Sequence, residues 1–196
     1  MDIPETTLEI LTLGRFSISV DGKPVATDWP NETVKIFFCS LLSPLDLYIT
    51  WDRICRVILG APDTRVRRRR LEETFIRPLN SFLVKELGFT LLVTGRDGIR
   101  IEHHGIHVDA IEFHDAVIEA LRLLSIGNHD AAREKISLAE SLYVGNYLPG
   151  ISGKIIENTR KELESLYQIA IMDSGRHANT VHNRTRQHFT APARRV

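Results

Sequence analysis

Hydrophobic and polar positions alternate over the first 28 residues, which is the pattern of β-strands with one buried face. Asp21-Gly22 interrupts the alternation, and Asp-Gly is a strong signal for a tight hairpin turn. The stretch therefore predicts a small antiparallel sheet. The apolar residues expected on the inward faces of its strands are Leu8, Ile10, Phe16, Ile18 and Val20.

The apolar spacing then changes to every three or four residues, which is typical of amphipathic helices. Asn31 and Thr50 can each cap a helix through a side-chain oxygen. A third and longer helix begins after Asp63 or Thr64, and Gly88 closes it as a C-cap residue would. The three predicted helices cover approximately residues 31–42, 50–59 and 64–87.

Pro78 interrupts the third predicted helix. It lacks the N–H group that would bond the carbonyl of Thr74, and its ring collides with that carbonyl in a regular α-helix. Proline also moves the residue before it, here Arg77, away from helical backbone angles. We therefore expect a kink or a break near Thr74 to Arg77, and a break would leave Pro78 at the favourable first position of a second helix.

Beyond Gly88, the segments FTLLV and IRIE flank a GRDG turn, which predicts a β-hairpin. A sheet, three helices and a hairpin, in this order, are the elements of a winged helix-turn-helix. From Val108 onward the pattern is helical, with three helices expected near 109–124, 131–143 and 154–172. Paired helices joined by short turns are typical of a repeat-like, all-α domain.

The chain beyond Asp173 contains five arginines and few apolar residues, so we expect a disordered basic tail. The predicted fold class is therefore α+β, with three parts. Residues 1–106 form a winged helix-turn-helix with an N-terminal antiparallel sheet, residues 107–172 an all-α helical domain, and residues 173–196 the tail.

The charge of the chain is balanced, with 25 basic and 25 acidic residues, and this balance argues mildly against a nucleic-acid binder. The charge is concentrated locally, however, because six arginines lie between Thr64 and Arg77. On an ideal helix Arg70, Glu73 and Arg77 share one face. Guanidinium groups on that face can bridge phosphates or read guanine edges, and Glu73 can accept from a cytosine amino group or hold both arginines. The alternative is a solvated face with intrahelical ion pairs.

No other pattern in the sequence indicates catalysis or a cofactor. Phosphate-binding loops and nucleophile motifs are absent from the sequence, and His103, His104 and His107 lack a carboxylate or thiol that would complete a metal site. Cys39 and Cys55 lie in apolar stretches, as expected for reduced, buried cysteines of a cytosolic protein. The sequence contains no membrane-spanning run and no signal-peptide pattern, so we expect a cytoplasmic protein that is not an enzyme.

Several segments resemble a known family of regulators. FIRPLNSFLVKELG resembles the end of the recognition helix in OmpR-type winged-helix domains, with Pro78 in place of a basic residue. LEILTLGRFSISVDGKPV is similar to the first sheet of SARP-type antibiotic regulatory proteins. HVDAIEFHDAV and AESLYVGNYLPG resemble the bacterial transcriptional activator domain (BTAD) that follows in such regulators. The resemblance covers approximately residues 8–172 and includes a truncated BTAD.

The resemblance implies a sequence-specific regulator that binds double-stranded DNA, with the third helix in the major groove. It also implies an all-α domain of TPR-like (tetratricopeptide-repeat-like) helices that mediates homodimerisation or contacts with RNA polymerase or another regulator. We expect Arg70 and Arg77, with Glu73 and Thr74 beside them, to contact bases or phosphates. Arg67 and Arg68 would contact the flanking backbone, and Arg96 at the tip of the hairpin a phosphate or the minor groove.

A second hypothesis remains open from the residues. The balanced charge, Pro78 and the two glutamates, Glu72 and Glu73, are also compatible with a protein-interaction module that keeps a degenerate winged helix and no longer binds DNA. The two hypotheses differ in one measurable property, which is binding to duplex DNA at moderate salt.

Overall fold

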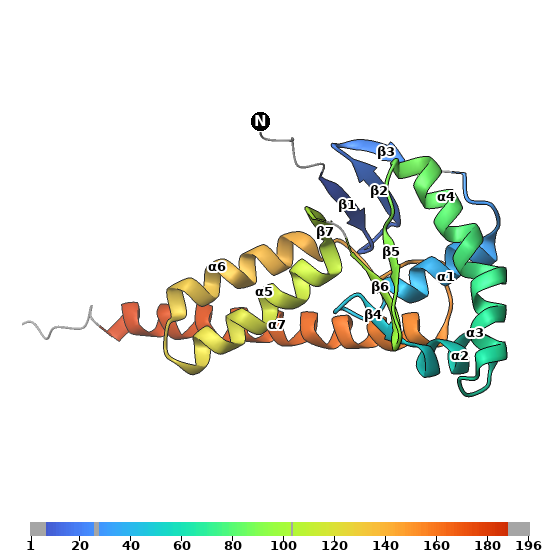
Figure 1. The fold of residues 1–196 in the computed structure, drawn as a ribbon. Coiled ribbons are helices and arrows are strands. Elements are labelled where there is room, and N and C mark those ends of the chain that lie inside the picture. Colours follow the sequence, from blue (N-terminus) through green and yellow to red (C-terminus); the bar gives the residue numbers. More distant parts are fainter. Residues whose placement is uncertain (1–6, 26–27, 103, 188–196) are drawn as a thin grey trace, which may run out of the picture.

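The computed structural model describes residues 7–25, 28–102 and 104–187, with side chains described as far as Ala170. Figure 1 shows two sheets and the helices α1 to α4 gathered in one part of the molecule, from which α5, α6 and α7 extend to one side. The long helix formed by α3 and α4 runs along the outer edge of the first part.

The first sheet contains four strands in the order β3-β2-β1-β7. The predicted hairpin turn is present, because Asp21 and Gly22 both have positive φ, at 49° and 75°. The expected antiparallel sheet gains one strand, β7, which pairs parallel with β1. Three residues are too short a run to show a period, so the sequence did not predict β7. The strands are β1 (Leu8–Leu11), β2 (Ser17–Val20), β3 (Lys23–Val25) and β7 (Ile106–Val108).

The predicted helix caps of the winged-helix part are confirmed. Asn31 Oδ1 accepts a hydrogen bond from the Val34 amide, 2.9 Å away, and Thr50 caps the next helix in the same way. Thr64, not Asp63, caps the third helix, and Gly88 ends it with φ of 83°. The helices are α1 (Glu32–Leu42), α2 (Trp51–Leu59) and a long helix of three segments, α3 (Arg65–Leu71), η1 (Glu72–Ile76) and α4 (Arg77–Leu87).

The long helix accommodates Pro78 by a π-helical turn, η1, in place of a break. The Arg77 amide bonds the carbonyl of Glu72, five residues back, and Arg77 keeps helical angles of −62° and −50°. The expected displacement of Arg77 from helical geometry is therefore wrong. A π turn widens the helix by one residue, which relieves the contact between the proline ring and the preceding turn, and α4 begins with Pro78 in its first positions.

The predicted hairpin of the wing is present as β5 (Leu92–Thr94) and β6 (Gly98–Ile101). A third strand that the sequence did not predict, β4 (Tyr48–Thr50), pairs with β6 on the other side. Gly98 allows this pairing, because a Cβ atom there would lie 2.2 Å from the carbonyl oxygen of Ile49.

The helical part consists of α5 (Asp109–Ser125), α6 (His129–Leu142) and α7 (Lys154–Gln187). The expected end of the last helix near Met172 differs from the structure, where α7 continues to Gln187. Extending a helix that is already formed avoids the cost of nucleation, and residues 173–187 contain no proline that would stop it. The remainder of the predicted tail, 188–196, lies outside the described residues.

Two hydrophobic cores meet at α1. The first fills the space between the two sheets, α1 and α4, and includes the predicted apolar residues Leu71, Leu79 and Phe82 of the long helix. The second lies among α5, α6 and α7 and reaches into the winged-helix part through Leu13 and Cys39. Because α1 contributes side chains to both cores, the two parts of the molecule pack as a continuous body.

A buried carboxylate, that of Asp109, joins the first sheet to α5. One of its oxygens accepts hydrogen bonds from the Thr12 amide at 2.7 Å and the Thr12 hydroxyl at 2.6 Å, and the other from the Leu13 amide at 2.9 Å. The sequence indicated Asp109 as a helix cap, whereas Val108 occupies the cap position and Asp109 is the first helical residue. The side chain therefore bonds mainly to the chain segment after β1.

The segment LYVGNYLPG forms the second joint between the two parts. Arg160 of α7 donates to the carbonyl oxygens of Tyr147, Leu148 and Ile151 at 2.8 to 2.9 Å, which holds the segment against α7. Gly145 is required here because a Cβ atom would lie 2.8 Å from Cα of Gly14. The BTAD-like motif thus folds into a tight backbone contact with the winged-helix part.

Replacing Asp109 with alanine should destabilise the whole molecule. It removes the acceptor of three hydrogen bonds from Thr12 and Leu13, whose backbone donors stay buried, so we expect a loss of about 2–4 kcal/mol in the free energy of unfolding by urea. Asp115→Ala is the matched control, because that carboxylate is exposed and pairs only with its neighbour His114. A loss below about 1 kcal/mol for Asp109→Ala would contradict the role assigned to this carboxylate.

Candidate nucleic-acid interface

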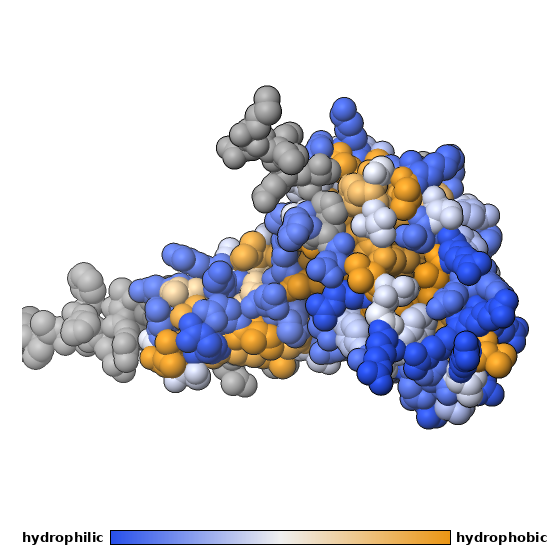
Figure 2. Space-filling model, viewed as in Figure 1, coloured by the Kyte–Doolittle hydropathy of each residue, from blue (hydrophilic) through white to orange (hydrophobic). Residues whose placement is uncertain are grey.

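The long helix α3–η1–α4 exposes most of its arginines on the outer surface of the molecule. Figure 2 shows a hydrophilic surface over this helix. Arg70 and Arg77, the two predicted base or phosphate contacts, are exposed, and so are Glu73 and Thr74 between them. The residues that sequence reasoning did not assign to the site, although they lie in the same arginine cluster, are Arg65 and Arg69.

The π turn changes which arginines lie side by side. One extra residue in a turn rotates the following helix by about 100° relative to an ideal α-helix. The expected alignment of Arg70 with Arg77 is therefore wrong, and Arg69 takes that place. Arg69, Glu73 and Arg77 border an open depression of about 420 Å³, which Arg70 does not line. The remaining lining residues are Arg65, Arg68 and Glu72.

Glu73 lies between the two aligned arginines. Its Oε1 atom accepts a hydrogen bond from Nε of Arg69 at 2.8 Å. This bond and the charges of Arg69 and Arg77 lower the pKa of Glu73, and the same bond raises the pKa of Arg69. Both side chains are largely exposed, so solvent screens the pair and it can open at small cost when another anion approaches.

Arg77 also borders a second depression, of about 330 Å³, between the long helix and the wing. The helix contributes Ile76 and Asn80, and β5 contributes Leu92 and Thr94. Arg77 therefore stands where the outer face of the helix meets the side that faces the wing.

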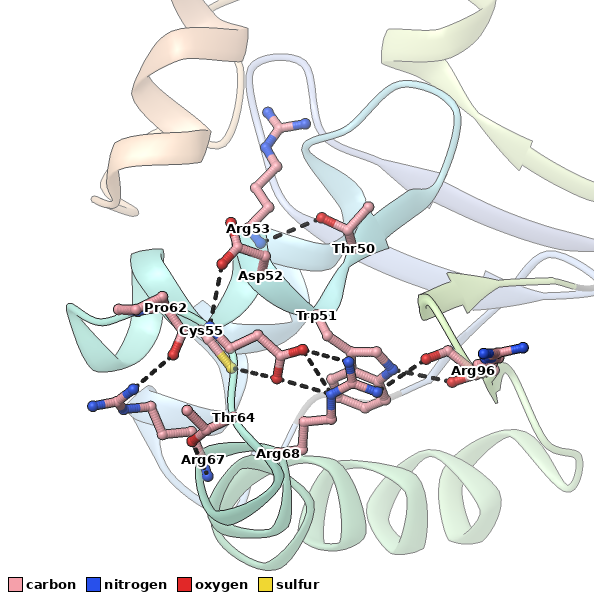
Figure 3. Close-up of polar contacts among 12 residues, drawn as sticks. Thr50, Trp51, Asp52, Arg53, Cys55, Pro62, Thr64, Arg67, Arg68 and Arg96 are labelled. Carbon is pink, nitrogen blue, oxygen red and sulfur yellow. Dashed lines mark hydrogen bonds and ion pairs between the residues drawn. The ribbon is translucent and has the colours of Figure 1, made fainter.

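Arg68 forms a different kind of contact, shown in Figure 3. Its Nε atom lies 2.8 Å from both carboxylate oxygens of Asp63, and Nη2 pairs with the same carboxylate. Nη1 donates to the carbonyl oxygen of Arg96 at 3.0 Å, and the guanidinium lies 5.4 Å from the ring centroid of Trp51. These contacts leave the Arg68 side chain 38% exposed, and its expected contact with the DNA backbone stays a prediction.

The tip of the wing is held by the same residues. Trp51 Nε1 donates to the carbonyl of Gly95 at 3.0 Å, and the Trp51 amide donates to the carbonyl of Asp97 at 3.1 Å. We call Trp51, Asp63 and Arg68 the wing anchor, because together they join the α2–α3 turn, the long helix and the hairpin tip. The hydrogen bond from Arg68 lowers the pKa of Asp63.

The other predicted site residues lie around the wing anchor. Arg96 is exposed, and Figure 3 shows its guanidinium directed away from Arg68. Arg67 is half-buried, and its Nη1 atom donates to the carbonyl of Pro62 at 2.8 Å. Sequence reasoning missed Trp51 and Asp63, since only the fold brings them to Arg68 and the wing.

Among the described residues, no three histidine, cysteine, aspartate or glutamate side chains lie together in a way that could hold a metal ion. Within the same residues, none of the helices has the length and apolar character needed to cross a membrane. Cys39 and Cys55 are buried and form no disulfide, and burial raises the pKa of the Cys39 thiol to about 12.

The fold is similar to that of a solved regulator. No protein-family model matches the sequence, and no curated protein matches it. Among solved structures, the chain is similar to EmbR of Mycobacterium tuberculosis, in a complex with a low-affinity phosphopeptide, with a TM-score of 0.65 and 16% identity. The match covers 94% of this chain and 51% of the EmbR chain, so the chain spans about half the length of EmbR. The predicted fold class, a winged helix followed by a helical domain, is confirmed by its similarity to the EmbR fold.

Arg68→Ala should release the wing tip while leaving the rest of the fold intact. The carbonyl of Arg96 loses its donor and the Trp51 ring loses its cationic partner, so the Trp51 indole N–H should exchange with solvent at least several-fold faster. The measurement is hydrogen exchange by NMR, in which Trp29 reports on the unaffected core. Arg70→Ala is the matched control, and equal exchange in the two variants would rule out the wing anchor.

Proposed function

We propose that this protein is a DNA-binding transcriptional regulator of the SARP type. The proposal rests on one observation: a winged-helix scaffold exposes aligned arginines on its long helix and holds the wing at a fixed place beside them. The SARP-like fold supports the class of protein, and the arginine surface supports duplex DNA as its partner. A regulator of this kind acts in the cytoplasm of a bacterial cell.

In this proposal the long helix lies in the major groove. Arg69 and Arg77 lie two turns apart in a helix that holds one extra residue in its π turn, which corresponds to about 11 Å along the helix axis, or about three base-pair steps. Arg69 and Arg77 contact phosphates or guanine edges, and Glu73 orients both or accepts from a cytosine. Arg70, Thr74 and Arg67 contact the flanking backbone, and Arg96 reaches a phosphate or the minor groove.

The helices α5, α6 and α7 are proposed to carry the protein contacts of the regulator, either in a homodimer or with RNA polymerase or another regulator. The support for this role is the resemblance of VDAIEF and LYVGNYLPG to BTAD motifs. These segments form the joints with the winged-helix part, so a partner bound to the helices would stand in a set orientation relative to DNA.

A second candidate is a protein-interaction module that has lost DNA binding. The observation in its favour is that Arg68 and Arg69 already have carboxylate partners, Asp63 and Glu73. Retention on heparin and a shift of duplex DNA at moderate salt should both be absent under this hypothesis. Under the first hypothesis both should be present and weaken with salt.

Arg77→Ala and Arg69→Ala should each reduce the salt dependence of duplex binding. Loss of one phosphate contact lowers the slope of log affinity against log salt by about one. Titrations by fluorescence anisotropy at several salt concentrations provide the slopes. Arg122→Ala is the matched control, since Arg122 pairs with Glu119 at 2.7 Å on α5 much as Arg69 pairs with Glu73. Slopes that do not differ from wild type in Arg69→Ala/Arg77→Ala would remove this helix from the interface.

A further inference from the structure

The most exposed large hydrophobic side chain of the described residues lies in the middle of the arginine cluster. Val66 is 79% exposed. Figure 2 shows a small apolar patch beside hydrophilic surface in the region of α3. Arg65, which precedes Val66, and Arg69, one turn further along the helix, are also exposed, so the apolar side chain of Val66 is presented beside two cations.

The position of Val66 determines which chemical groups of a bound duplex it could contact. Val66 is the second residue of α3 after the Thr64 cap, in the first turn of the long helix. Helix-turn-helix proteins place the N-terminal residues of this helix against base edges in the major groove. The base edges there present donors, acceptors and a single apolar group, the 5-methyl group of thymine.

We infer that Val66 is a specificity-determining residue that contacts the 5-methyl group of a thymine in the major groove. This inference rests on the proposed DNA binding and adds to it a defined base at one position of the operator. The neighbouring arginines attract the phosphate backbone, which carries no sequence information. Val66 distinguishes a thymine from the other bases at one position. Because the contact is apolar, it should be insensitive to salt, unlike those of Arg69 and Arg77.

The test combines a protein variant with the removal of one methyl group from the DNA. A duplex selected from random sequences for binding to the wild-type protein is remade with deoxyuridine in place of each thymine in turn. Deoxyuridine lacks only the methyl group. At one position the wild-type protein should bind the uracil duplex about fourfold more weakly, the factor for losing one buried methyl group.

Val66→Ala should bind the thymine and uracil duplexes with equal affinity at that position. Val84→Ala is the matched control: Val84 lies near the far end of the same helix, is 39% exposed, and should leave the fourfold preference intact. Both valines are exposed, so both variants should fold, and circular dichroism can verify this.

Two results separate the failure of this inference from the failure of DNA binding. If the wild-type protein binds the selected duplex but no thymine position shows the preference, or if Val66→Ala retains it, the inference is overturned and the proposed function stands. If the wild-type protein binds no duplex at moderate salt, the proposed function falls and the inference falls with it.

Discussion

The guanidinium of Arg68 is the group on which the candidate interface depends. Its contacts with Asp63, with the ring of Trp51 and with the carbonyl of Arg96 join three chain segments. Without them the tip of the wing would be held by its strands and by the two hydrogen bonds from Trp51 to Gly95 and Asp97. With them, the tip of the wing and the first turn of the long helix are joined directly, which fixes the exposed side chains on both relative to each other.

The arginines of this segment are therefore of two kinds: those that form contacts within the protein and those that remain accessible to a partner. The net charge of the chain does not distinguish them. Arg68 contributes to the fold, and Arg67 is partly engaged through the carbonyl of Pro62. Arg69 and Arg77 remain at the surface, where Glu73 holds Arg69 through a hydrogen bond and does not neutralise the local excess of positive charge. A chain with zero formal charge can therefore present a cationic face, because the carboxylates that balance it lie elsewhere on the molecule or are used internally, as Asp63 is.

The winged-helix part and the helices α5 to α7 are joined by buried hydrogen bonds. A flexible linker would have no such bonds. Asp109 binds the segment after β1, and Arg160 secures the turn that packs against Gly14. Hydrogen-bonded groups of this kind are costly to separate, because their donors and acceptors would remain buried without partners. The helical part is thus held in a fixed orientation relative to the long helix α3–η1–α4.

The sequence by itself determined the features that depend on local interactions. Asn31, Thr50 and Gly88 act within one turn of the chain, so their capping roles, the hairpins and the order of elements were predictable. The strands β4 and β7 were not, because three residues carry no readable period and acquire their structure only from a distant partner. Pro78 marked the place of an irregularity, but only the packed helix showed a π turn there, which puts Arg69 in line with Arg77. The role of Arg68 was likewise decided by tertiary structure, since Trp51 and the wing reach it only after the chain has folded.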